Sequence, residues 1–169
     1  MFNDQTVVIT GAGRGIGASA ALQFADHGAS VVVNDLDAAM AAQTANAIMS
    51  RGGQAAAVPG DVNAPGFPEL LMQTAVDTFG KLNVVVNNAG YTWDAMAHNL
   101  TDEQWQAILD VHLSAPFRMI RAAAPFLRTA AAAELESGAN LSNRCIVNVS
   151  STSGLHGNIG QANYAAGKM

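Results

Sequence analysis

Short apolar runs rich in β-branched residues alternate with longer helical stretches along the chain, and this alternation constrains the fold most. The runs are Thr6–Thr10, Ser30–Asn34, Ala55–Val58, Leu82–Val86 and Cys145–Val149. Helical patterns occupy about 15–27, 37–51, 66–80, 102–136 and the residues from 161 onward. Strands that alternate with helices form parallel sheets, and strands covered on both faces are apolar throughout. The sequence therefore predicts a doubly wound, Rossmann-like α/β fold with helices on both faces of a parallel sheet.

The longest helical stretch carries signals for its start and for an interruption. Thr101 followed by Gln104 is a capping-box pattern that opens a helix. Pro116 and Pro125 lie inside the stretch and predict a kink or a break, because proline cannot donate a backbone hydrogen bond. The polar residues 137–143 that follow predict an exposed turn.

Composition excludes several classes of protein. The net charge of −5 and a pI near 5.1 argue against a nucleic-acid or anionic-membrane surface. No apolar run reaches the roughly 18 residues of a membrane helix, and the first residues lack the pattern of a signal peptide. Cys145 is the only cysteine, in an apolar run that predicts a buried, unreactive thiol. We therefore expect a cytoplasmic protein without a disulfide or a metal site.

A glycine-rich turn separates the first predicted strand from the first predicted helix. Its residues are Gly11, Gly13, Arg14, Gly15, Ile16 and Gly17. Glycines here let the backbone turn tightly and approach a pyrophosphate, which then lies at the helix N-terminus. The turn therefore predicts a nucleotide site.

An acidic residue, Asp35, ends the second predicted strand and is followed by Leu36. A carboxylate at this place accepts hydrogen bonds from the ribose hydroxyls of NAD and repels the 2′-phosphate of NADP. Asp37 is a second candidate, although it fits better as the cap of the next helix. NAD(H) is the preferred cofactor, while Arg14 offers a phosphate contact that leaves NADP(H) as the alternative.

Tyr164 and Lys168 lie four residues apart near the end of the chain, which places them on one face of a helix. A nearby cation favours the phenolate and moves a phenol pKa of about 10 towards neutrality. Tyr164 is therefore a candidate general acid that gives a proton to a carbonyl oxygen.

These motifs together resemble the short-chain dehydrogenase/reductase family. The matching segments are Thr10–Gly17, Asp61–Val62, Asn87–Gly90, Ser151 and Tyr164–Lys168, in that order. The resemblance implies that Asp61 contacts adenine beside Val62, and that Asn88, Ala89 and Gly90 line the cofactor. It also implies that Ser151 holds the substrate oxygen and that Lys168 binds the nicotinamide ribose. The amides of Asn87 and Asn88 can also tie strands together.

His112 departs from the family pattern, which usually has asparagine at this position. That asparagine helps to hold a water in the proton relay to the lysine. A histidine can also donate and accept hydrogen bonds, and its ordinary pKa is about 6.5. Two interpretations stay open, a relay residue and a histidine that only packs in the helix.

The segment before Tyr164 is similar to that of 3-oxoacyl-ACP reductases, while 31–36 and 111–113 resemble the 3-hydroxyacyl-CoA dehydrogenase domain of peroxisomal multifunctional enzymes. These resemblances imply that a 3-hydroxyacyl and a 3-oxoacyl thioester are interconverted. Another secondary alcohol, such as a hydroxysteroid or small polyol, is the alternative substrate.

A third interpretation of the function is that the protein is a nucleotide-binding fragment without catalysis. Residues 1–169 are expected to form a single dinucleotide-binding domain, truncated at its C-terminal end, because family members continue past the lysine. The family also implies a homodimer or homotetramer for the full-length protein.

Overall fold

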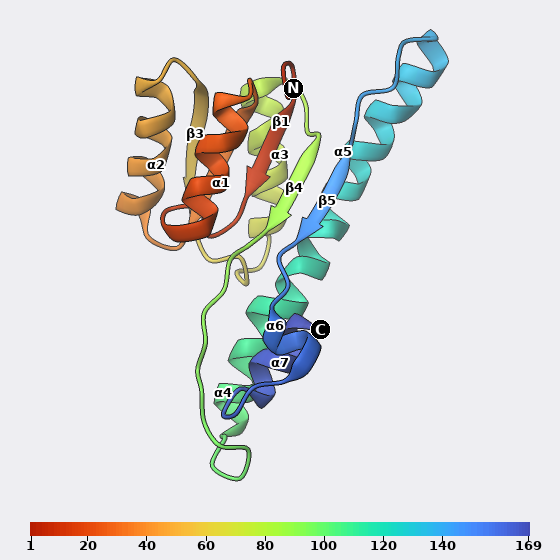
Figure 1. Ribbon diagram of the computed structural model, residues 1–169. Helices are drawn as coiled ribbons and strands as arrows, with labels where there is room; N and C mark the ends of the chain where they lie inside the picture. Colours follow the sequence, from red (N-terminus) through yellow and green to blue (C-terminus); the bar gives the residue numbers. More distant parts are fainter.

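The computed structural model describes residues 1–169 as a five-stranded parallel sheet with helices on both faces (Figure 1). The strands lie in the order β3-β2-β1-β4-β5. Their bounds are β1 (Thr6–Ile9), β2 (Ser30–Asp35), β3 (Gln54–Pro59), β4 (Val84–Asn87) and β5 (Cys145–Asn148). The main helices are α1 (Gly15–Asp26), α2 (Ala38–Ser50), α3 (Phe67–Phe79), α4 (Asp102–Leu109) and α5 (Ala115–Ser137). The predicted α/β fold class is confirmed.

Two apolar layers form the core, one on each face of the sheet. Alternate residues of one strand point to opposite faces, so β1 contributes Val8 to one layer and Val7 and Ile9 to the other. The layer around Val8 packs against α3 and α5, and the other layer packs against α1 and α2. The central strands β1, β2 and β4 are therefore apolar along nearly their whole length, as double coverage requires.

The strand β5 lies at one edge of the sheet and is much less covered than the sequence predicts. Val147 is 41% exposed, and Cys145 is exposed as well. The prediction of a buried thiol at Cys145 is therefore wrong. An apolar run alone does not tell a central strand from an edge strand, because the difference lies in which helices reach it.

The predicted long helix consists of two α-helices that are joined by a π-helical turn, without a break in the helical chain. The capping box at Thr101 is present, with its hydroxyl accepting from the Gln104 amide. A π-helical turn, η1 (Asp110–Ser114), then joins α4 to α5. Pro116 lies near the start of α5, directly after this turn, and α5 continues through Pro125. The alternative of a break at Pro125 is therefore wrong.

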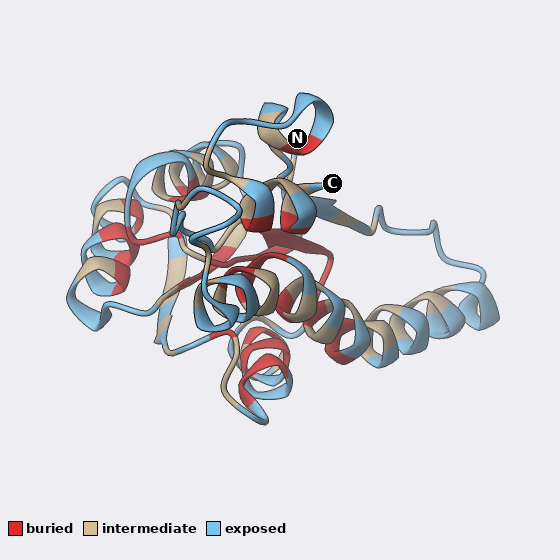
Figure 2. Cartoon of the chain, turned by 90° about the horizontal axis from the view of Figure 1, so that it is seen from below, coloured by how far each residue is buried: buried red, intermediate tan, exposed pale blue.

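The second half of α5 extends away from the sheet, and its residues are largely exposed (Figure 2). Arg144, just before β5, makes two hydrogen bonds to the Glu134 carboxylate, at 2.6 and 2.9 Å. Together with hydrogen bonds from Ser142, the Arg144 guanidinium lowers the pKa of Glu134 from 4.5 to about 2. This clip ties the predicted exposed turn, 137–143, back to α5 at neutral pH.

Two short helices, α6 (Thr152–His156) and α7 (Ala162–Lys168), lie beyond the carboxyl ends of the strands, and α7 packs against both α4 and α6 (Figure 1). The sequence predicts α7 but not α6, which is too short to show a periodic pattern. No helix combines the length and the apolar character needed to cross a membrane.

Candidate active site

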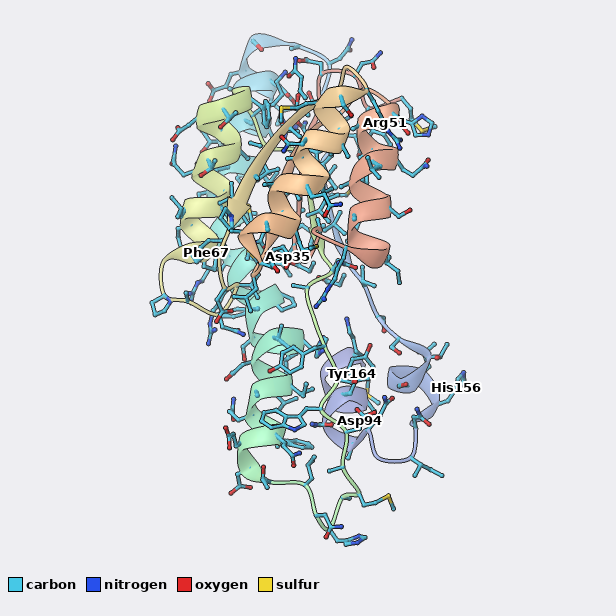
Figure 3. All side chains as sticks on the ribbon, turned by 90° about the vertical axis from the view of Figure 1, so that its left-hand side faces the viewer. Asp35, Arg51, Phe67, Asp94, His156 and Tyr164 are labelled. Carbon is cyan, nitrogen blue, oxygen red and sulfur yellow. The ribbon has the colours of Figure 1, made fainter.

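A cleft of about 830 Å³ opens at the carboxyl ends of the strands. It is bordered by the glycine-rich turn and the end of β2 on one side, and by α7 and η1 on the other. Figure 3 shows Asp35 at the lower end of the sheet and Tyr164 further down, on α7. Ligands of parallel α/β sheets bind in this place, outside the carboxyl ends of the strands.

The glycine-rich turn is packed too closely for side chains at one point. A Cβ on Gly17 would collide with the carbonyl oxygen of Gly11 and the amide of Asn88. The Asn88 amide donates to the carbonyls of Thr10 and Gly11, at 2.9 and 3.0 Å. Asn88 therefore holds the turn against β4, and Asn87 donates to the Asn148 side chain of β5 at 2.8 Å. The expectation that the amides of Asn87 and Asn88 tie strands together is confirmed.

The carboxylate of Asp35 already supports the loops around it. Its Oδ2 accepts from the Gly13 amide at 2.9 Å, and its Oδ1 accepts from the Asp37 amide at 3.1 Å. Carboxylate oxygens have further lone pairs that can accept from a ligand. The next residue, Leu36, is 76% exposed at the rim of the cleft. Asp37 caps α2, since its Oδ1 accepts from the Ala39 and Met40 amides.

The acidic and apolar pair at 61 and 62 forms another part of the cleft wall. Asp61 is exposed, with its Oδ1 accepting from the Asn63 amide at 2.8 Å. Val62 is buried and belongs to the core layer under α3 and α5. Val62 thus anchors the cleft wall in the core, while Asp61 faces the opening.

Three residues predicted to be catalytic meet at the other end of the cleft. Tyr164 is partly exposed, and Ser151 and Lys168 line the same opening. The Lys168 ammonium donates to the Val149 carbonyl at 2.6 Å, and its burial lowers its pKa. The Ser151 hydroxyl accepts from the Ser153 amide, which leaves its own hydrogen free to donate.

His112 lies in the π-helical turn η1 and is 7% exposed. Its Nε2 is 2.7 Å from the Tyr91 carbonyl oxygen, and its ring packs edge-on against Tyr164 with 4.9 Å between ring centroids. Because a carbonyl only accepts, Nε2 carries the hydrogen, and Nδ1 is a buried acceptor without a protein partner. Burial lowers the pKa of His112 below 6.5, so the ring is neutral at pH 7.

Two glycines make room for this imidazole. A Cβ on Gly90 would overlap the His112 ring, and a Cβ on Gly167 would lie 2.9 Å from the His112 Cβ. The histidine therefore fits between the segment after β4 and helix α7. Single-turn π-helical insertions are frequent at functional sites, where they re-aim a side chain.

The cleft gathers most of the residues predicted from the sequence. Those lining it are Gly11, Arg14, Ile16, Asp35, Leu36, Asp61, Val62, Asn88, Ala89, Gly90, His112, Ser151, Tyr164 and Lys168. Gly13, Gly15 and Gly17 shape the turn behind it without lining it. Sequence reasoning missed Tyr91 and Thr92, which directly follow the predicted segment Asn87–Gly90, and Asn34, Asn63 and Ser150, which adjoin predicted residues.

The cleft fits a dinucleotide in size and in chemistry. Its volume lies in the range of cofactor sites, about 300–1,000 Å³. Bare backbone at Gly11 and Gly17 suits a pyrophosphate at the start of α1, and Asp35 offers acceptors for ribose hydroxyls. The buried, unpartnered Nδ1 of His112 lies at the far end, beside Tyr164.

Comparison with known proteins agrees with this geometry. A family model described as short chain dehydrogenase matches residues 5–169. The chain is 38% identical to the peroxisomal hydratase-dehydrogenase-epimerase of Saccharomyces cerevisiae and 41% identical to the hydroxyacyl-CoA dehydrogenase ChsB1 of Mycobacterium tuberculosis. A solved structure, a short chain dehydrogenase from Mycobacterium avium, is 40% identical with a TM-score of 0.89.

These matches cover 99% of this chain but only part of each relative. The chain spans 18% of the yeast protein, 53% of ChsB1 and 59% of the Mycobacterium avium chain. The similarity therefore concerns only a part of each of these relatives.

Proposed function

Because the chain belongs to the short-chain dehydrogenase family, which confirms the resemblance drawn from its motifs, we propose that the protein is an NAD(H)-dependent oxidoreductase. One observation carries this proposal. A glycine-rich turn with an acidic residue at one end of the cleft faces Ser151, Tyr164 and Lys168 at the other. This arrangement holds a dinucleotide and a proton donor around one opening.

A 3-hydroxyacyl thioester and its 3-oxoacyl form are the proposed substrate pair. Two relatives are named for hydratase-dehydrogenase-epimerase and hydroxyacyl-CoA dehydrogenase activities, which favours CoA over acyl carrier protein as the carrier. The name of the yeast relative also includes the word peroxisomal, so the cytoplasmic location expected from the sequence stays a prediction.

Each residue has a defined task in this reaction. A nicotinamide cofactor bound in the cleft would supply the hydride chemistry at the carbon that carries the substrate oxygen. Tyr164 gives the oxygen a proton in reduction and takes it back in oxidation. The free hydrogen of the Ser151 hydroxyl donates to the same oxygen as charge develops. Lys168, a partly buried cation, stabilises the tyrosinate, and His112 offers Nδ1 as an acceptor to the relay that restores the proton.

The proposed activity is tested directly with the whole protein. We expect reduction of a 3-oxoacyl-CoA with NADH at a kcat/KM of at least about 10⁴ M⁻¹s⁻¹, followed through the absorbance of NADH. Turnover of only a hydroxysteroid or a polyol would contradict the thioester assignment. Binding of NADH without turnover of any secondary alcohol or ketone would instead identify a nucleotide-binding protein without catalysis.

The cofactor preference depends on Asp35 and Leu36. Asp35→Ala combined with Leu36→Arg should shift preference from NADH to NADPH, because it removes the repulsive carboxylate and adds a cation at the exposed rim. We expect a change of about 10²-fold or more in the ratio of the two dissociation constants, corresponding to about 2.7 kcal/mol.

Asp35→Ala alone is the control for loop support, since it also removes the acceptor for the Gly13 and Asp37 amides. It removes the repulsion of the 2′-phosphate but adds no cation, so the ratio of the two dissociation constants should change less than in the double variant. Tighter binding of NADPH than of NADH to the unmodified protein would overturn the assignment.

A further inference from the structure

Asn163 directly precedes Tyr164, and its side chain is completely buried. Every hydrogen-bonding group of this side-chain amide has a partner. Its Nδ2 donates to the Trp93 carbonyl and to the Gln104 carbonyl, each at 3.1 Å, and its Oδ1 accepts from the Tyr164 amide at 2.8 Å. An asparagine side chain has two N–H hydrogens and one carbonyl oxygen, so none of these groups is left unpaired.

These three bonds join three separate segments of the chain. Trp93 belongs to the segment after β4, Gln104 belongs to α4, and Tyr164 belongs to α7. Figure 3 shows Asp94, the neighbour of Trp93, on a segment that passes beside α7, and Asp94 itself accepts from Gln161 at 2.9 Å. The Asn163 amide is therefore the buried point at which α7 is fixed to the two elements around it.

Helix α7 depends on this amide because it starts without an ordinary cap. Gln161 occupies the N-cap position, and its side chain makes no capping hydrogen bond. The N–H of Tyr164 lies in the first turn and so has no partner within the helix. The Oδ1 of Asn163 supplies that partner and thereby fixes the start of the helix at the residue that carries the phenol.

We propose that Asn163 is a positioning residue that sets the place of the Tyr164 phenol in the cleft. This inference rests on the proposed role of Tyr164 as the proton donor. One turn further along the same face of α7, Gly167 packs closely against the Cβ of His112, which leaves little freedom at that point. Loss of the amide bonds would let the start of α7 tilt about this contact and move the phenol away from the substrate oxygen.

The test compares Asn163→Asp with Thr101→Ala in the whole protein. The aspartate keeps the shape and the acceptor but removes both donors, so the carbonyls of Trp93 and Gln104 lose these hydrogen bonds. Thr101→Ala removes the hydroxyl that caps α4 through the Gln104 N–H but removes none of the groups that bond to Asn163, and it controls for loss of stability in α4. Both are assayed where circular dichroism shows them fully folded.

We expect Asn163→Asp to lower kcat by about 10²-fold, as misplacement by about 1 Å does, with KM and the NADH dissociation constant within about threefold of the original values. Thr101→Ala should keep its kcat. A fully folded Asn163→Asp protein with unchanged kcat would overturn the proposal, as would an equal loss in both variants.

Amide hydrogen exchange of Tyr164 gives a second readout that needs no turnover. Asn163→Ala should exchange this amide at least about tenfold faster than the unmodified protein, because it removes the acceptor. Thr101→Ala should leave it protected. If the unmodified protein turned over no thioester, the proposed function would fail while this measurement still tested the role of Asn163. Equal exchange rates in all three proteins would overturn that role.

Discussion

Tyr164→Phe is expected to lower turnover by at least about 10³-fold while the protein still folds and binds NADH, because general acid catalysis of this kind contributes about 10²–10⁴-fold. The substitution removes one hydroxyl from a partly exposed ring at the end of the cleft. The edge-on contact of the ring with His112 can persist, since phenylalanine has the same ring. Only the transferable proton is lost.

Two measurements separate this role from simple packing. Lys168→Ala should lower turnover and also weaken NADH binding, because Lys168 lines the cleft proposed for the cofactor and donates to the Val149 carbonyl. Tyr164→Phe should change the rate alone, as seen in kcat at saturating NADH. A phenylalanine variant that kept about a tenth of the activity, equivalent to about 1.4 kcal/mol of barrier, would contradict the role as general acid.

The sheet could be predicted because its central strands are buried on both faces. Apolar runs of the required length and spacing mark β1, β2 and β4, and all three are found within the predicted ranges or one residue beyond them. The apolar run at β5 likewise predicts a strand that is buried on both faces, yet Val147 and Cys145 are exposed. Which helices cover a strand decides whether it is buried, and the residues of the strand alone do not show this.

The candidate site was predictable where its chemistry depends on residue type. Glycines at a turn, an acid after a strand and a tyrosine four residues before a lysine are visible in the sequence. Tyr91 and Asn163 escape this reasoning, because Tyr91 acts through its backbone carbonyl and Asn163 through burial between three segments. The π-helical turn was also missed, since Pro116 marks the start of α5 but does not reveal the widened turn before it.

His112→Leu is expected to lower turnover at least about tenfold, equivalent to about 1.4 kcal/mol of barrier, whereas His112→Asn should keep most of the activity. Leucine fills much of the space between Gly90 and Gly167 but offers no acceptor in place of Nδ1, and it leaves the Tyr91 carbonyl without its donor. Asparagine retains an oxygen and an N–H. The comparison therefore separates hydrogen bonding from the filling of space.

The pH dependence gives an independent check on His112. Its Nδ1 accepts only in the neutral ring, and burial lowers the pKa below 6.5. Turnover of the unmodified protein should therefore be constant near pH 7 and fall as the pH drops through that lowered pKa. His112→Asn should lose this fall, because an amide does not titrate there. Equal rates for the asparagine and leucine variants, with equal pH profiles, would mean that the imidazole only fills the space between the two glycines.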